Sequence, residues 1–111
     1  MGRDENTASA SAEAYRSFGA FYPFYLSQHA DRTCRRLHFL GTTLGLAGVI
    51  TAVATLNFWW LLAGIVAGYA AAWVGHFFFE KNKPATFTYP VYSFLGDWVM
   101  WGEMLRGRIK F

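Results

Sequence analysis

The longest feature of the hydrophobic pattern is a stretch without charge, since residues 37–79 contain no Asp, Glu, Lys or Arg. About 20 apolar residues are enough for a helix to cross the hydrocarbon core of a bilayer, so this stretch has room for two spans. We expect the break near Asn57, the most polar residue inside the run, because a tryptophan pair just beyond it is typical of a membrane interface. The pattern therefore predicts an antiparallel transmembrane hairpin with spans at residues 37–56 and 58–79.

Small residues recur at close spacing along both predicted spans. Membrane helices use such positions to bring their backbones close together. A water-soluble hairpin core remains open as an alternative, although soluble helices normally carry a polar face and these carry none. The small residues are Gly41, Gly45 and Gly48 in the first span and Gly64, Gly68, Ala71, Ala72 and Gly75 in the second.

Two shorter helices are expected on either side of the hairpin. Apolar and aromatic positions recur at threes and fours over about residues 12–28, which predicts an amphipathic helix with a kink or restart at Pro23. Residues 91–105 predict an apolar helix that carries Asp97 and Glu103 and is too short and too acidic to span alone, so we expect it to be interfacial or re-entrant. The N-terminal pattern consists of Tyr15, Phe18, Phe21, Tyr22, Tyr25 and Leu26.

Composition and charge agree with this all-α membrane helical bundle. The chain is 54% hydrophobic and 15% charged, and its 111 residues predict one domain with a flexible tail at residues 1–12. A net charge of +3 without a basic stripe argues against nucleic acid as a partner. Every basic flank of the hairpin lies on the same side, which predicts cytoplasmic termini for an integral protein of a bacterial inner membrane or the endoplasmic reticulum. These flanks are Arg32, Arg35, Arg36, Lys81, Lys83, Arg106, Arg108 and Lys110.

The predicted hairpin brings the histidines of the chain together. His38 lies 19 residues before Asn57 and His76 lies 19 residues after it, so the two imidazoles are expected at nearly the same depth. Glu80 follows His76 by one helical turn, and His29 can fold back to the same level. Ionisable groups at membrane depth are costly unless they are paired or functional. A metal site and a hydrogen-bonded interfacial cluster both fit this convergence.

Three segments carry a resemblance to a known family. They read FYPFYLSQH at residues 21–29, RLHFLGT at 36–42 and GHFFFEKNKPA at 75–85. Over about residues 15–107 the chain resembles the small membrane proteins of the DUF962 or Mpo1-like family. The resemblance implies an iron(II)-dependent dioxygenase that shortens long-chain 2-hydroxy fatty acids by one carbon, a fatty acid α-oxidation.

The resemblance also assigns site residues. His29, His38 and His76 match the histidines of the family and Glu80 the glutamate that follows them, so all four are expected to hold Fe²⁺, with His76 and Glu80 central to catalysis. Cys34 stands where the family usually has an asparagine. Independently, imidazole and carboxylate form the ligand set of non-haem iron(II) oxygenases, and zinc would suit the same donors.

A 2-hydroxy fatty acid can chelate such a metal through two oxygens and react with dioxygen, the expected co-substrate. Arg35, Arg36 or Lys81 could hold its anionic head, and Asn82 and Asp97 are candidates for the shell around the metal ligands. Membrane lipid is the expected surrounding, and a homo-oligomer stays open. The alternative is a non-catalytic scaffold or lipid-binding protein with an interfacial histidine cluster. Metal content distinguishes the two interpretations.

Overall fold

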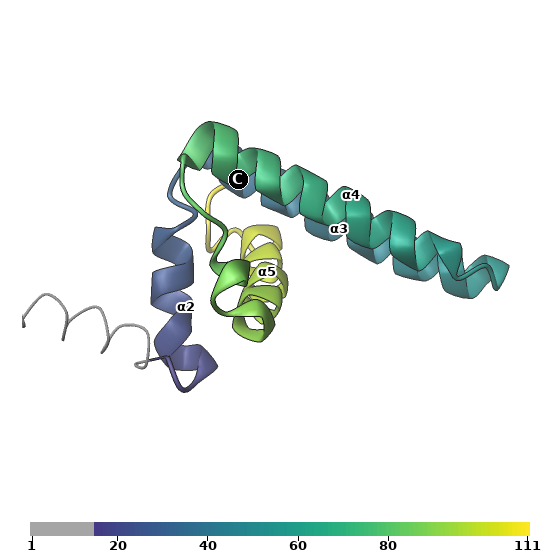
Figure 1. Ribbon diagram of the computed structural model, residues 1–111, viewed down its shortest axis with the longest axis horizontal. Coiled ribbons are helices and arrows are strands. Elements are labelled where there is room, and N and C mark those ends of the chain that lie inside the picture. Colours follow the sequence, from purple (N-terminus) through teal and green to yellow (C-terminus); the bar gives the residue numbers. More distant parts are fainter. Residues whose placement is uncertain (1–14) are drawn as a thin grey trace, which may run out of the picture.

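The computed structural model describes residues 15–111, so the expected tail at residues 1–12 lies outside the described part. All regular structure within residues 15–111 is helical, as the sequence predicts. The two longest helices, α3 (Arg32–Thr55) and α4 (Trp59–Val74), lie side by side and antiparallel, and they are joined at residues 56–58 (Figure 1).

The first long helix begins earlier than the prediction at residue 37. The side chain of Asp31 accepts a hydrogen bond from the backbone N–H of Cys34 at 2.9 Å and so caps the helix. The stretch without charge marked only the apolar part of the helix and missed residues 32–36, three of which are arginines. At the other end, Leu56 adopts a left-handed conformation with φ 54° and terminates α3.

The second long helix ends in a different type of helical turn. Residues Gly75–Glu80 continue α4 as a π-helical turn, η1, so the helical rod runs over Trp59–Glu80. This rod and α3 are each long and apolar enough to cross a membrane, with mean hydropathies of 1.6 and 1.7 in their most apolar windows. Only 17% and 22% of the residues in those windows are buried, whereas the core helix of a soluble protein would be mostly covered.

Glycines form the seam between α3 and α4. A Cβ atom at Gly41 would lie 2.6 Å from the carbonyl oxygen of Gly68, and one at Gly48 would lie 2.6 Å from that of Trp60. Real side chains do not fit at such distances, so the two backbones are in direct contact, as the stripe of small residues predicts. Gly45 is different, because a Cβ atom there would meet nothing within 4 Å.

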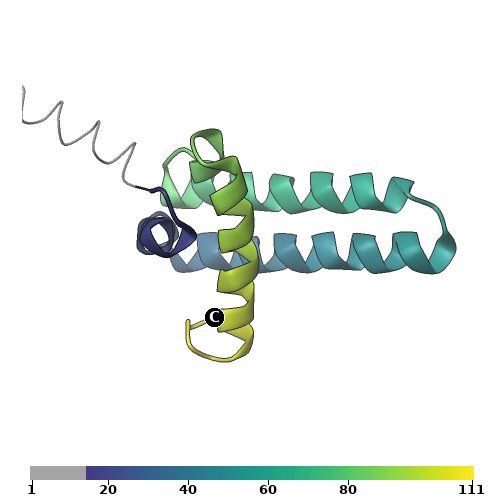
Figure 2. The same cartoon turned by 90° about the horizontal axis from the view of Figure 1, so that it is seen from below.

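Two shorter helices pack at the end of the hairpin opposite the turn. Helix α2 (Phe18–Ser27) is capped by Ser17, so it begins later than predicted within the described residues, while residues 12–14 lie outside them. Pro23 lies inside this helix, so the helix does not restart there. Helix α5 (Pro90–Leu105) follows the short 3₁₀ helix η2 (Ala85–Phe87) and runs across α3 and α4 (Figure 2). The buried core joins α2 to α5 and consists of Phe21, Tyr25, Ala85, Met100 and Met104.

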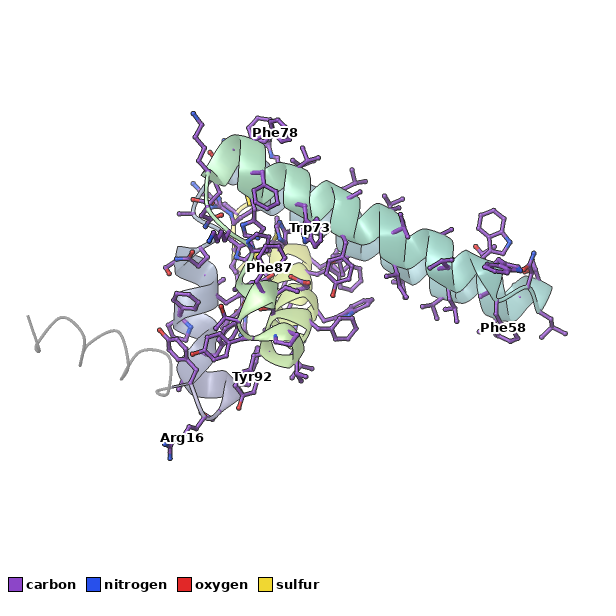
Figure 3. All side chains as sticks on the ribbon, viewed as in Figure 1. Arg16, Phe58, Trp73, Phe78, Phe87 and Tyr92 are labelled. Carbon is purple, nitrogen blue, oxygen red and sulfur yellow. The ribbon has the colours of Figure 1, made fainter. Side chains whose placement is uncertain are left out.

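At the end of the hairpin where residues 56–58 form the turn, no helix of the described residues covers α3 and α4. Side chains project outward all along α3 and α4, and Phe58 extends from the free end (Figure 3). Phe58 is 60% exposed and Trp59 is 75% exposed. An apolar surface of this extent is typical of contact with lipid or with other protein.

Candidate metal centre

Three histidines from three separate segments meet where the short helices cross the hairpin. His29 follows the end of α2, His38 lies on the second turn of α3 and His76 lies in η1. All three are buried, with exposed fractions of 2%, 4% and 2%. Their candidate ligand atoms lie within 4.8 Å of one another. The convergence expected from the hairpin is therefore present in the structure.

Hydrogen bonds at Nδ1 determine which ring nitrogens of His29 and His38 are available. Nδ1 of His29 donates to the carbonyl oxygen of Tyr25 at 2.6 Å, and Nδ1 of His38 donates to that of Cys34 at 3.0 Å. A carbonyl only accepts, so in each ring the proton resides on Nδ1 and Nε2 carries a lone pair. The two Nε2 atoms are 3.0 Å apart. Two lone pairs that face each other at this distance repel, and a cation between them would remove the repulsion.

The third ring is oriented by an amide. Nδ1 of His76 donates to Oδ1 of Asn82 at 2.7 Å. The amide nitrogen of Asn82 in turn donates to the backbone carbonyl of Gln28 at 3.2 Å and to its side-chain oxygen at 3.1 Å. These bonds identify Oδ1 as the acceptor and leave Nε2 of His76 available as well. Fixing the far nitrogen of a ligating histidine in this way is characteristic of metal sites.

The burial of the rings bears on whether the cation between them is a proton or a metal ion. It lowers the pKa of His29 well below the usual 6.5, and the neighbouring His38 lowers it further, while the hydrogen bond to Tyr25 acts weakly in the opposite direction. His29 is therefore neutral at pH 7, and a shared proton is disfavoured. Two nitrogens bound to one metal at about 2.1 Å and at right angles are about 3.0 Å apart. The three imidazoles can hold a metal ion.

Two cavities adjoin the histidines. The smaller has about 10 Å³ of space and is lined by all three rings. The larger is an apolar groove of about 220 Å³ that follows α3 and α4 as far as Val49 and Leu61. The two cavities lie next to each other, because four residues line both. These are His38, Tyr69, Ala72 and Asp97.

Asp97 is held at this junction by Tyr25. The phenol of Tyr25 donates a hydrogen bond to Oδ1 of Asp97, and its ring stacks on His29 with the centroids 4.0 Å apart. Burial raises the pKa of Asp97 to about 7, although the bond from Tyr25 lowers it in part. Burial, followed by the charge of Asp97, raises the pKa of the Tyr25 phenol. A Cβ atom at Gly96 would lie 2.8 Å from the Tyr25 ring, so this glycine lets α5 approach α2.

The structure does not bring Glu80 into the histidine group. Its Oε1 accepts a hydrogen bond from the backbone N–H of Asp31 at 2.7 Å, so it ties the end of η1 to the start of α3. The prediction assumed an α-helix, in which residues four apart share a face. The turn that carries His76 and Glu80 is π-helical, and its wider spacing rotates the carboxylate away. Metal ligation by Glu80 remains only a prediction.

The basic residues proposed for the substrate head have other contacts. Arg35 donates to the carbonyl oxygens of Ala30 at 2.8 Å and His29 at 3.3 Å, which fixes the loop that carries His29. Nε of Arg36 donates to the carbonyl oxygen of Phe111 at 2.9 Å. Lys81 is exposed and has φ 59°. None of these three residues lines the groove or the small cavity.

Sequence reasoning missed several residues of the site. Tyr25 supports both His29 and Asp97, and Ser93 lines the small cavity. Their spacing was a usable signal, since Tyr25 precedes His29 by four residues and Ser93 precedes Asp97 by four. Gln28 gave no comparable signal, because its contact with Asn82 depends on the tertiary fold.

Comparison with known proteins identifies the family. No curated protein and no solved structure matches the chain. A family model described as "2-hydroxy-palmitic acid dioxygenase Mpo1-like" matches residues 15–109. The matched range includes all three histidines, Asn82, Ser93 and Asp97, and it covers nearly the whole described part. The chain therefore belongs to the Mpo1-like family.

Proposed function

We propose that this protein is an iron(II)-dependent dioxygenase that shortens long-chain 2-hydroxy fatty acids by one carbon. The observation that carries the proposal is the pair of Nε2 lone pairs of His29 and His38, which face each other at 3.0 Å next to His76. The description of the family gives the reaction class. The apolar groove that begins at the histidines gives a place for an acyl chain.

In the proposed site His29, His38 and His76 hold the metal through Nε2. Iron(II), when bound, supplies the redox chemistry that lets dioxygen react with an organic acid. The carbonyls of Tyr25 and Cys34 keep two of the rings in the required tautomer. Glu80 strengthens the site from outside, because it fixes the segment that carries His76 against the start of α3.

The two ends of the groove indicate how the substrate is oriented when it binds. Its inner end is lined by His38 and Asp97, and its outer end by Val49 and Leu61. The segment of α3 from His38 to Val49 is about 16 Å long at the rise of an α-helix. An acid bound with its polar head at the histidines therefore extends its chain along the glycine seam, away from water. Burial of the chain in the groove supplies the binding free energy that positions the head.

The stoichiometry requires no further reductant. A 2-hydroxy acid and dioxygen balance to the shortened acid, carbon dioxide and water. The carbon that bears the hydroxyl is oxidised to a carboxyl, and the former carboxyl carbon leaves as carbon dioxide. Together these changes supply the four electrons that dioxygen takes up. A plain fatty acid lacks the partly oxidised carbon and cannot complete this balance.

The membrane arrangement is part of the proposal. We place α3 and the α4–η1 rod across a bilayer with both termini cytoplasmic, because the basic residues flank the histidine end. A cysteine introduced by Asn57→Cys in a Cys34→Ser background should react with an impermeant thiol reagent added from outside. Labelling only after the membrane has been opened would contradict this orientation.

Product analysis tests the reaction. The purified iron(II) protein is given dioxygen with 2-hydroxypalmitic acid or with palmitic acid, and the products are identified by mass spectrometry. We expect the acid one carbon shorter from the hydroxylated substrate and a preference on the order of 10⁴ over the plain acid. Equal processing of both acids, or no shortened acid with iron present, would contradict the proposal and favour a lipid-binding protein without catalysis.

A further inference from the structure

Ser93 carries a polar atom that the protein itself does not use. Its side chain is only 2% exposed, and Oγ has no hydrogen-bond partner. A buried hydroxyl without a partner costs free energy, so such a group usually meets a ligand or a water. Ser93 lines the small cavity together with the three histidines. The unused hydrogen bond is therefore available at the candidate metal centre.

Asp97 lies one helical turn after Ser93 on the same face of α5, and it lines the same cavity. The phenol of Tyr25 donates to Oδ1 of Asp97, so this hydrogen bond does not occupy Oδ2. The histidines come from other segments than α5. This helix thus provides a hydroxyl and a carboxyl group to the cavity that the three imidazoles also line.

A hydroxyl group suits this pair, because it accepts one hydrogen bond and donates another. The small cavity has about 10 Å³ of space, which is about enough for one water-sized group. The acyl chain that follows the hydroxyl-bearing carbon can continue into the groove, since Asp97 lines both spaces.

We propose that Ser93 and Asp97 recognise the 2-hydroxyl of the fatty acid, with Ser93 Oγ donating to its oxygen and the Asp97 carboxyl accepting its hydrogen. This inference rests on the proposed function, because it assumes a 2-hydroxy acid as the ligand. It explains why the site selects a hydroxylated acid before any reaction occurs. It also assigns a role to α5, which contributes none of the three histidines.

Equilibrium binding without dioxygen tests the inference apart from turnover. The full-length iron(II) protein in detergent is titrated anaerobically with 2-hydroxypalmitic acid and with palmitic acid. We expect Ser93→Ala to reduce the preference for the hydroxylated acid about tenfold, since one hydrogen bond in the bound state is lost. Its affinity for palmitic acid should remain as in the wild type. Ser27→Ala is the matched control, because Ser27 is exposed and bonds only the carbonyl of Phe24.

Thermal stability separates recognition from a structural role. Ser93→Ala removes a buried atom without a partner, so the ligand-free variant should unfold at the same temperature as the wild type or higher. A lower unfolding temperature would indicate that Ser93 supports the fold, and it would contradict the inference. An unchanged preference for the hydroxylated acid in Ser93→Ala would also overturn it. A wild-type protein without any preference would contradict both this inference and the proposed function.

Discussion

The two ends of the α3–α4 hairpin are built from the same two helices and have opposite chemistry. At the turn, Leu56 and Trp59 are more than 70% exposed, and no helix within residues 15–111 covers them. At the other end, His38 and His76 are almost completely buried, and the cavity that they line is also lined by Tyr25 of α2 and by Ser93 and Asp97 of α5. Hydrogen bonds join His29, His38, His76 and Asn82 at this end to residues of other segments or turns, whereas Asn57 at the turn bonds its near neighbours Thr55 and Trp59.

The difference shows how a chain of this size can combine an exposed apolar surface with a buried polar site. The glycine seam holds the two helices in contact along their length, so it supports both ends equally. Only the crossing helices distinguish them, because α2 and α5 exclude solvent from the histidines. The α3–α4 hairpin is thus the support, and the three histidines of the candidate metal centre are buried only where the crossing helices cover them.

The largest effect should come from filling the groove that leads away from the histidine end. Gly45 lines this groove, and a Cβ atom there would meet nothing within 4 Å, so Gly45→Leu adds a side chain to the groove without a clash. We expect turnover of long-chain 2-hydroxy acids to fall by a factor on the order of 100, because a displaced acyl chain misplaces the head. Steady-state product formation measures this loss.

The matched control for that variant is Gly102→Leu. Gly102 also has open space around its Cβ position, and it lies outside the groove. Both substitutions replace glycine within a helix and should slightly favour the helix. Iron content and unfolding temperature should therefore stay near the wild-type values in both variants. Equal loss of turnover in both would contradict an acyl chain in the groove.

The next largest effect is expected from a comparison of two asparagines, one at each end of the hairpin. Asn82→Ala removes the acceptor for Nδ1 of His76, which should weaken metal affinity about 10-fold to 100-fold. Asn57→Ala changes the turn, far from the histidines, and should leave metal affinity unchanged. Competition with a chelator of known affinity measures both variants. Equal affinities would show that the orientation of His76 does not depend on Asn82.

The smallest effect concerns Glu80, where sequence and structure differ. Its carboxylate accepts from the backbone of Asp31, and Glu80→Gln keeps an acceptor there but removes the charge. We expect iron content to stay at the wild-type level and stability to fall by about 1 kcal/mol, as for a charge-assisted bond replaced by a neutral one. Loss of iron in Glu80→Gln would instead support the carboxylate as a ligand.

Most of the fold could be predicted from hydrophobic patterning. The stretch free of charge marked the long helices, and the glycine stripe marked their seam, because both depend on local composition. Helix starts were less accurate, since they depend on single caps such as Ser17 and Asp31. The packing of α2 on α5 could not be predicted, because the contact of Gly96 with the Tyr25 ring is set by tertiary structure.

The position of a site residue could be predicted where it depends only on the number of residues along a regular helix. Equal distances from the turn brought His38 and His76 to one level, and this level is where the structure has them. The same reasoning failed for Glu80, because a π-helical turn changes the face on which the fourth following residue lies. Ser93 stayed unnoticed, since an unpartnered hydroxyl is visible only when its surroundings are known.

Iron content tests the central claim most directly. Elemental analysis of protein purified without oxygen should give about one iron per chain for the wild type and for Asn57→Ala. His29→Ala, His38→Ala and His76→Ala should each lose the metal, while the helices persist in detergent because their backbone hydrogen bonds are internal. Circular dichroism verifies that helix content is kept. Full iron occupancy in His76→Ala, or no iron in the wild type, would contradict the three-histidine metal centre.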